Sequence, residues 1–233
     1  MDLQQARVLV VGATGVLGGA LAASLAGRGA RLAVSGRRSD ALAEVAARLG
    51  DVPSFELDLV DVEACGRVVR AAAEQLGGLD ALVVASGVAG FGPARDEQDA
   101  VVEELFAVNT FGPMGLVRAA LPVLAPGGGV AVVTAVLADV PTAGMAAYSA
   151  SKAAMSAYLT AVRREVRRDK ISVLDARPGH LETGLAERAL AGTPPRMPQG
   201  GDVDAVVELI VQGIESGRSE LVADLRNGSV SLR

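Results

Sequence analysis

The sequence predicts an α/β protein in which a parallel sheet is covered by helices on both faces. Short, mostly apolar runs of four to six residues recur from end to end, as expected of strands buried on both faces. Between these runs, apolar residues repeat every three or four positions, as on one face of a helix. Because a strict alternation of strand and helix implies parallel strands joined by right-handed crossovers, we expect a doubly wound sheet.

Six strands and two clear helices follow from these patterns. The strands are expected at residues 8–11, 31–35, 54–57, 81–85, 130–134 and 171–176. The clearest helices span 62–76 and 203–214, where the apolar side chains share one face. No linker, repeat or low-complexity tract interrupts the pattern, so we expect one domain over residues 1–233.

One segment late in the chain should lack regular structure. Residues 192–201 begin and end with glycine and contain Pro194, Pro195 and Pro198, between two stretches of helical pattern. Such a segment in a doubly wound fold could cover a bound small molecule, and we place a substrate loop near 184–201. An ordinary exposed connection would have the same composition.

The composition excludes several classes of protein. The 233 residues are 50% hydrophobic and 21% charged, which suits a soluble globular domain. The formal charge of -5 opposes a nucleic-acid or anionic-membrane partner, because both attract an excess of Lys and Arg. The single cysteine, Cys65, cannot form an internal disulfide, and no paired Cys or His spacing indicates a metal site. We therefore expect a cytoplasmic protein without a metal.

Two uncharged stretches approach the roughly 20 apolar residues that span a membrane. Residues 8–27 contain several glycines and follow only one basic residue, Arg7, which is a poor start for a signal peptide. Residues 119–138 are broken by Pro122, Pro126 and a run of glycines, a pattern typical of a helix end, a turn and a buried strand. We expect no membrane partner.

A glycine-rich turn joins the first strand to the first helix. It runs from Gly12 to Gly18 and also contains Thr14, Gly15 and Leu17. Glycines at this place allow a tight turn, close approach of the backbone to a diphosphate and close helix packing, with the phosphates at the helix N-terminus. The position of these glycines predicts a dinucleotide-binding Rossmann fold.

The end of the second strand indicates which dinucleotide binds. An acidic side chain here would accept hydrogen bonds from the adenosine ribose of NAD, but the chain has Ser35, Gly36, Arg37 and Arg38. Guanidinium groups suit a 2′-phosphate through charge-assisted hydrogen bonds. We therefore expect NADP (NADPH), with a solvated helix entry as the alternative interpretation of both arginines.

Tyr148 and Lys152 lie four residues apart, which puts them on one face of a helix. An ammonium one turn from a phenol favours the phenolate, which lowers a phenol pKa from about 10 toward the range of a general acid or base. Lys152 and Lys170 are the only lysines in a chain that otherwise uses arginine. The pair predicts proton transfer, although such pairs also occur on solvated helix faces.

With these residues in hand, the chain resembles the short-chain dehydrogenase/reductase family in its compact single-domain form, over nearly its whole length. The motifs occur in the family's order: the turn at Gly12 to Gly18, then Asp58 and Leu59, then Ala85, Ser86 and Gly87, then Asn109, Tyr148 and Lys152, and finally Pro178 and Gly179 with Thr183. The whole set is far more specific than any single motif.

The resemblance implies an NADP-dependent oxidoreductase that transfers a hydride between a nicotinamide cofactor and a carbonyl or secondary alcohol. Tyr148 would be the acid or base at the substrate oxygen, and Lys152 would hold the nicotinamide ribose and lower the Tyr148 pKa. Asn109 would support a water that relays protons. A polar residue that satisfies backbone groups at a helix irregularity is the alternative for Asn109.

The same resemblance implies the cofactor contacts and the assembly. Asp58 and Leu59 would contact the adenine, Ala85 and Gly87 would belong to the turn after the fourth strand, and Pro178, Gly179 and Thr183 would lie against the nicotinamide. The family commonly pairs through its two long central helices, so a homo-oligomer is implied.

Two departures from the family's pattern bear on activity. The compact form usually has glycine where this chain has Val16, so the glycine spacing resembles extended and atypical branches. The family's active-site serine lies thirteen residues before the tyrosine, and that position is Ala135. The neighbouring Thr134 would point its hydroxyl to the opposite face of the strand unless the strand bulges.

These departures keep two alternatives open. The loss of a hydroxyl at Ala135 favours a nucleotide-binding protein with weak or no dehydrogenase activity. The glycine spacing admits an epimerase or dehydratase, but the chain lacks the larger C-terminal substrate region of that branch. The joint presence of Tyr148, Lys152 and Asn109 favours the oxidoreductase.

Cys65 and His180 are weaker candidates for a functional role. Cys65 lies on the apolar face of its helix, so we expect it in the core. His180 follows Pro178 and Gly179 and precedes Glu182, where it could contact a substrate. A lone histidine beside an acid is more often an ordinary surface pair.

Overall fold

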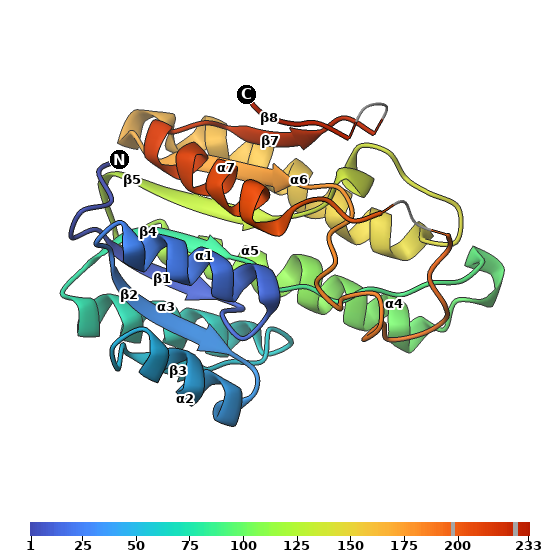
Figure 1. Cartoon of the computed structure of the whole chain (residues 1–233), viewed down its shortest axis with the longest axis horizontal. Helices are drawn as coiled ribbons and strands as arrows, with labels where there is room; N and C mark the ends of the chain where they lie inside the picture. Colours follow the sequence, from blue (N-terminus) through green and yellow to red (C-terminus); the bar gives the residue numbers. More distant parts are fainter. Residues whose placement is uncertain (197–198, 226–227) are drawn as a thin grey trace.

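The computed structural model describes residues 1–196, 199–225 and 228–233, and they form one eight-stranded sheet (Figure 1). Its strands are β1 (Arg7–Val11), β2 (Arg31–Gly36), β3 (Ser54–Glu56), β4 (Leu79–Val84), β5 (Leu124–Val133), β6 (Ser172–Arg177), β7 (Glu220–Ala223) and β8 (Val230–Leu232). Their order is β3-β2-β1-β4-β5-β6-β7-β8, and only the pair of β7 and β8 is antiparallel. The predicted doubly wound parallel sheet is confirmed.

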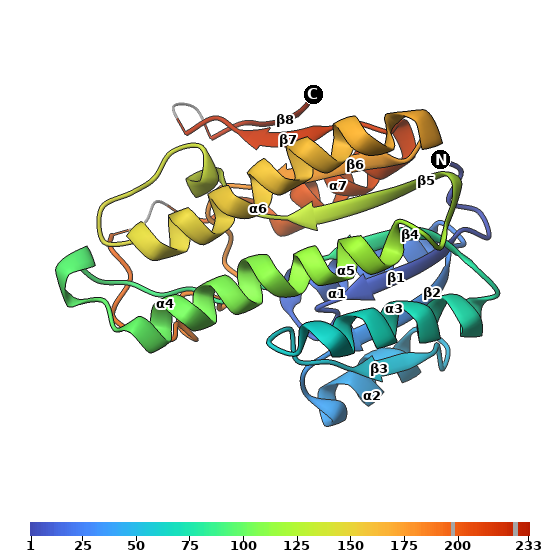
Figure 2. The same cartoon turned by 180° about the vertical axis from the view of Figure 1, so that it is seen from behind.

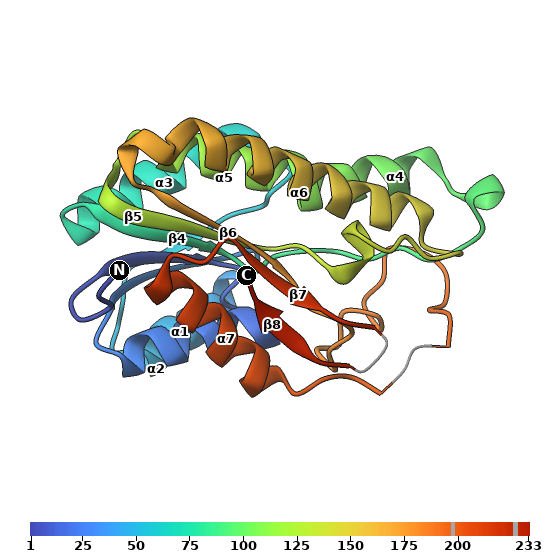
Figure 3. The same cartoon turned by 90° about the horizontal axis from the view of Figure 1, so that it is seen from above.

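Helices cover both faces of this sheet, which forms the middle of three layers (Figure 3). One layer contains α1 (Val16–Gly27), α2 (Ser39–Arg48) and α7 (Val203–Ser216). The other contains α3 (Val62–Leu76), α4 (Asp99–Phe106), α5 (Gly112–Ala120) and α6 (Ala146–Glu165), with α3, α5 and α6 side by side (Figure 2). Short helical turns add η1 (Ala94–Asp96), η2 (Ala107–Phe111), η3 (Val136–Ala138) and η4 (Val166–Asp169).

The strands read as continuous apolar runs because each strand contributes to two cores. In β1, Leu9 and Val11 pack into the core under α3, α5 and α6, whereas Val8 and Val10 pack into the core under α1, α2 and α7. Successive strand side chains point to opposite faces, so a strand covered on both sides needs apolar residues at every position. The apolar runs therefore predict the strands well.

The helices begin and end where local chemistry dictates. The Asp61 carboxylate accepts a hydrogen bond from the Ala64 N–H at 2.8 Å and so caps the start of α3. Gly77 ends the same helix with a left-handed backbone, a common role of glycine at a helix C-terminus. In between, the predicted apolar face, which includes Cys65, is buried as expected.

Several expectations about individual elements were wrong. The parallel sheet has an antiparallel strand at its edge, β8, and β7 and β8 are too short and too polar to stand out in the sequence. β5 starts at Leu124, because the predicted glycine turn forms an irregular part of the strand. The stretch before residue 192 is irregular too, since helical spacing is only a weak signal in a short segment. The predicted irregular role of Pro198 falls outside the described residues.

One continuous helical stretch, Asp99–Ala120, is long and apolar enough to cross a membrane by length and composition alone. It comprises α4, the π-helical turn η2 and α5, and half of its most apolar window is buried inside the protein. Core helices of soluble proteins pass the same test. The burial of Leu105, Leu116 and Val117 accounts for its apolar composition.

Candidate active site

The carboxyl ends of the parallel strands open into one cleft of about 590 Å³. Ligands of doubly wound sheets bind at this edge, because the loops that follow the strands converge there. The predicted site residues that line the cleft are Gly12, Thr14, Gly15, Leu17, Arg37, Arg38, Asp58, Leu59, Ala85, Gly87, Tyr148, Lys152, Pro178, Gly179 and Thr183. The other two predicted residues, Gly18 and Asn109, are buried behind this lining.

The turn between β1 and α1 is packed too tightly for any residue with a side chain at Gly18. A Cβ there would lie 2.1 Å from the Gly12 carbonyl oxygen, so α1 approaches the end of β1 as closely as a backbone can. Gly12 itself has a φ of +88°, which favours glycine. The first N–H groups of α1 have no side-chain cap, and Gly15 and Leu17 line the cleft. This arrangement fits the diphosphate of a dinucleotide.

Two guanidinium groups lie at the end of the cleft where β2 stops. Arg37 and Arg38 line the cleft and are exposed. Within the described ranges, neither forms an ion pair with a carboxylate. The preceding backbone is fixed, because the Ser35 carbonyl accepts hydrogen bonds from Gly12 and Ala13. This end of the cleft can therefore bind an anionic group.

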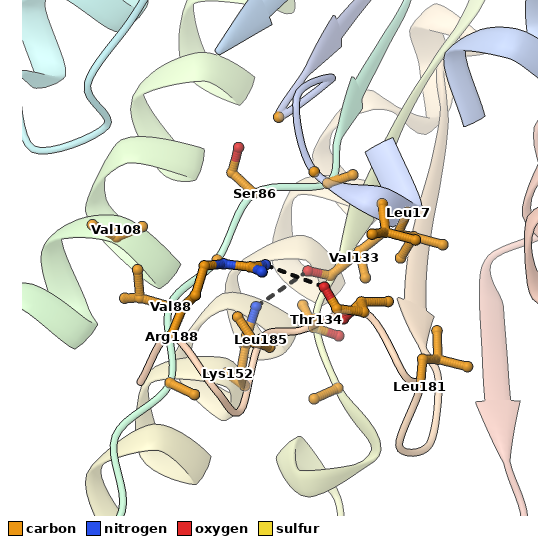
Figure 4. Close-up of a pocket in the computed structure, with 18 of the residues that line it drawn as sticks. Leu17, Ser86, Val88, Val108, Val133, Thr134, Lys152, Leu181, Leu185 and Arg188 are labelled. Atoms are coloured by element: carbon orange, nitrogen blue, oxygen red, sulfur yellow. Dashed lines mark hydrogen bonds between the residues drawn. The ribbon is translucent and has the colours of Figure 1, made fainter. Parts of the chain in front are cut away.

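Helix α6 places Tyr148 and Lys152 one turn apart on the cleft wall, and both side chains are buried. The Lys152 amine donates to the Val133 carbonyl at 3.4 Å (Figure 4), and it lies 5.9 Å from the centre of the Tyr148 ring. Burial raises the pKa of Tyr148 to about 12 and lowers the pKa of Lys152 to about 8. The net Tyr148 pKa is raised rather than lowered as expected, because burial outweighs any effect of the Lys152 charge in this structure.

Asn109 lies in the π-helical turn η2, and its carboxamide is fully engaged with neighbouring groups. Its Oδ1 accepts from the Val88 N–H at 3.0 Å, and its Nδ2 donates to the Val88 carbonyl at 2.9 Å and to the Ser151 hydroxyl at 3.1 Å. The side chain thus holds the loop after β4 against α6. This geometry matches the alternative role, a polar residue that satisfies backbone groups at a helix irregularity.

The position of the expected serine carries no hydroxyl, and the adjacent threonine does not replace it. Ala135 lines the cleft and packs in one cluster with Tyr148. The Thr134 hydroxyl donates instead to Asp175 at 2.5 Å, beneath the cleft. β5 and β6 pair without a bulge up to Val133, and although Thr134 also lines the cleft, its hydroxyl is engaged by Asp175.

Sequence reasoning missed an apolar wall beyond Tyr148. Four apolar side chains line this part of the cleft and belong to one hydrophobic cluster with Ala135: Phe91, Leu137, Met145 and Leu185. They come from loops far apart in the chain, so no periodic pattern marks them in the sequence. The wall can accommodate the apolar part of a small molecule.

The segment after β6 folds over this wall and is fixed at its far end. The Phe91 N–H donates to the Ala191 carbonyl at 2.9 Å, and a Cβ on Gly192 would lie 1.9 Å from the Phe91 carbonyl oxygen. Leu185 and Arg188 of this segment line the cleft (Figure 4), and Arg188 donates to the Thr183 carbonyl at 3.2 Å. Part of the expected loop near 184–201 therefore borders the cleft.

His180 also borders the cleft, but its side chain pairs with Glu182, two residues further along the chain. Its Nε2 lies 3.4 Å from the Glu182 carboxylate, and that carboxylate is largely exposed. The ordinary pair expected as the alternative is what the structure shows. Nothing in this geometry gives His180 a role in chemistry.

Comparisons with known proteins agree with this architecture. The chain is 34% identical over 197 residues to "Dehydrogenase/reductase SDR family protein 7-like" of Anopheles gambiae, covering 80% of this chain and 62% of that protein, so it spans less than two thirds of that relative. It is 32% identical over 226 residues to an "Uncharacterized oxidoreductase" of Myxococcus xanthus (strain DK1622), covering 94% of this chain and 88% of that protein.

Solved structures and a family model complete the comparison. A short-chain dehydrogenase from Streptomyces avermitilis matches with a TM-score of 0.83 and 27% identity, covering 95% of this chain and 89% of that one. A short chain dehydrogenase from Burkholderia cenocepacia J2315 in complex with NADP matches with a TM-score of 0.80 and 28% identity, covering 92% of each chain. Residues 6–193 match the model described as short chain dehydrogenase. The chain therefore belongs to the short-chain dehydrogenase/reductase family of oxidoreductases.

Proposed function

We propose that this chain is an NADP-dependent oxidoreductase that acts on a carbonyl or secondary alcohol, with Tyr148 as the acid or base. One observation carries the proposal: the buried pair of Tyr148 and Lys152 lies on the wall of the same cleft that the N-terminus of α1 and the two arginines after β2 border. A cofactor and a reacting group can therefore meet within one enclosed space.

Tyr148 is in the protonated form that proton donation to a carbonyl requires. Since burial raises its pKa to about 12, the phenol is protonated at neutral pH, as a general acid must be. A bound nicotinamide supplies the hydride in this direction and accepts it in the reverse one. Tyr148 would donate its proton to the carbonyl oxygen as the carbonyl carbon accepts that hydride, so an alcohol would form and the phenolate would be left for reprotonation.

Lys152 is proposed to hold the nicotinamide ribose and to stabilise that phenolate. With a pKa lowered by burial to about 8, its amine is mostly charged at neutral pH. Asn109 is proposed to act indirectly, since its side chain fixes the backbone of Val88 at the cleft wall. A water relay through Asn109 stays a prediction.

The choice of NADP over NAD is proposed on the charge at the end of β2. Arg37 and Arg38 are exposed in the cleft, and among the described residues neither has an acid to pair with. The end of the strand lacks the carboxylate that would favour NAD. The NADP complex of the Burkholderia relative is consistent with this choice.

A screen of carbonyls with NADPH, and of alcohols with NADP, tests the activity. The matched control uses the only two tyrosines in the chain, Tyr148 and Tyr158, which both lie on α6. Any activity found in the screen should be lost in Tyr148→Phe and kept in Tyr158→Phe. Equal activity in both variants would remove Tyr148 from the mechanism.

A second function, a nucleotide-binding protein with weak or no activity, is favoured by the absence of a hydroxyl at Ala135. The Thr134 hydroxyl faces Asp175, so it does not offer the substrate oxygen a donor. A donor aimed at the developing charge is typically worth about 10² to 10³ in rate. Tight NADPH binding without turnover of any substrate class would support this second function.

A further inference from the structure

A buried carboxylate lies directly beneath the cleft, where neither the sequence motifs nor the family comparison place a functional group. Asp175 of β6 has no exposed surface. Its Oδ1 accepts from the Thr134 hydroxyl at 2.5 Å, and its Oδ2 accepts from the Ser156 hydroxyl at 2.5 Å and from the Arg177 guanidinium at 2.7 Å. Three donors therefore hold one carboxylate, which fixes its position.

The donors connect Asp175 to both walls of the reactive part of the cleft. Ser156 lies on α6 one turn beyond Lys152, so the hydrogen bond to Ser156 ties the helix of Tyr148 and Lys152 to β6. Thr134 follows the end of β5, one residue after the Val133 carbonyl that accepts from Lys152. The carboxylate therefore joins the helix and the strand that position the Lys152 amine.

We infer that Asp175 is a positioning residue for Lys152: its buried charge keeps the Lys152 amine protonated in an apolar setting, and its hydroxyl partners hold α6 in register with β5 and β6. The inference deepens the proposed function, because it assigns the group that maintains the charge of the proposed ribose-binding lysine. Burying an ammonium without an opposite charge is costly, and Asp175 supplies that charge from the strand that is hydrogen-bonded to α6 through Ser156.

The electrostatic balance at Lys152 agrees with this role. Burial lowers the Lys152 pKa, and the charge of Asp175 opposes that decrease and keeps the value at about 8. Lysines buried without compensation fall to roughly 5 to 6. Other charged or titratable groups surround the pair; they are Tyr148 on α6, Arg177 on β6, Asp139 after η3, Glu220 on β7, and Arg188 in the segment that lines the cleft.

Arg177 extends the cluster toward the surface without displacing Asp175. Its side chain, 8% exposed, lies 2.9 Å from Asp139 and 3.2 Å from Glu220 as well as contacting Asp175. Because Arg177 has two further acids, its charge is balanced from the solvent side. The negative charge of Asp175 is therefore not cancelled by Arg177 alone and can act on Lys152.

The two lysines of the chain make the test direct. Lysine labelled with ¹³C at Cε gives only two side-chain signals, from Lys152 and Lys170, and a pH titration by NMR then reports the Lys152 midpoint in the full chain. Asp175→Asn should lower that midpoint by at least about 0.5 pH unit. Asp139→Asn is the matched control, because Asp139 also contacts Arg177 but its side chain is 45% exposed. The Lys152 midpoint in this variant should match that of the unmodified chain.

A cofactor titration gives a second readout. Since only the charged form of Lys152 should hold the ribose, a shift of about 0.5 pH unit predicts about twofold weaker NADPH binding by Asp175→Asn at pH 8 and little change at pH 6. A merely structural loss would weaken binding equally at both pH values. The NMR titration needs no cofactor or turnover, so it tests Asp175 even if the proposed function fails.

A folded Asp175→Asn variant whose Lys152 midpoint is unchanged would overturn the inference. If Asp175→Asn does not fold, the unmodified chain still decides, because its Lys152 midpoint should lie near 8. A midpoint below about 6 in the unmodified chain would mean that no charge compensates the buried amine, and the inference would be wrong.

Discussion

Replacing Gly18 by alanine tests how closely α1 packs against the turn that follows β1. A Cβ at this position would lie 2.1 Å from the Gly12 carbonyl oxygen and 2.7 Å from its carbonyl carbon. Both atoms belong to the backbone of the turn that lines the cleft, so no flexible side chain can move aside. The alanine can fit only if the turn and the N-terminus of α1 separate.

The size of this displacement follows from the contact. Real Cβ atoms essentially never approach another heavy atom below 3.0 Å, so a gap of 2.1 Å must widen by about 1 Å. Forcing an extra methyl group into a packed region typically costs about 1 to 3 kcal/mol. Each charge-assisted hydrogen bond to a phosphate that the displaced turn can no longer form removes about 1.5 to 3 kcal/mol of binding, roughly 10- to 100-fold in affinity.

Gly27→Ala, at the other end of the same helix, is the matched control. A Cβ there meets no atom within 4 Å, so the substitution adds only the better helix propensity of alanine, up to about 1 kcal/mol. For a chain of this size each kcal/mol moves Tm by about 2 to 4 °C. Gly18→Ala should therefore melt about 2 to 16 °C below Gly27→Ala in thermal unfolding, and it should bind NADPH at least about tenfold more weakly in a fluorescence titration.

The reasoning would be refuted by equal behaviour of the two variants. If Gly18→Ala melts with Gly27→Ala and binds NADPH within about threefold of the unmodified chain, the close contact between α1 and the turn does not exist or does not support the cofactor. A loss of stability with unchanged NADPH affinity would keep the packing argument. That outcome would, however, mean that the turn does not bind the phosphates of the cofactor.

Three further predictions concern the chemistry of the cleft. Tyr148→Phe should lower turnover by about 10² to 10⁴ while NADPH binding stays nearly intact, because only the hydroxyl is lost; steady-state rates and a fluorescence titration measure the two effects. The unmodified chain should bind NADPH at least about tenfold more tightly than NADH, and Arg37→Ala should reduce that preference, as paired titrations would show. Ala135→Ser should speed reduction of an activated carbonyl at least about tenfold, since it restores a donor at the cleft wall, and initial rates measure it.

Each of these predictions has an outcome that contradicts it. Turnover by Tyr148→Phe within about tenfold of the unmodified chain would assign proton transfer to another group. An NADH preference that persists in Arg37→Ala would disprove the cofactor assignment. No gain in Ala135→Ser beside an active parent would mean that another donor already serves the substrate oxygen, and no activity in either chain with NADPH bound would favour the second function.

The sequence alone determined the architecture and the location of the cleft. Strands buried on both faces need apolar residues at most positions, so β1 and β4 were visible as mostly apolar runs. The residues of the cleft follow such strands directly, because the carboxyl ends of parallel strands share one edge. The edge strands β7 and β8 were not visible, since short half-exposed strands carry little pattern.

What the side chains do in the cleft depended on tertiary contacts between distant residues. The spacing of Tyr148 and Lys152 predicted their shared helix face, but their burial, which raises one pKa and lowers the other, follows from loops packed around them. Asn109 was recognised by its place in the family's order, yet only the structure showed its carboxamide bound to Val88. No sequence motif marks Asp175. It became a candidate positioning residue because folding brings the hydroxyls of Thr134 and Ser156 to its carboxylate from two other parts of the chain. Local patterns are encoded within a few residues, whereas electrostatic environments are set by groups that only the fold brings together.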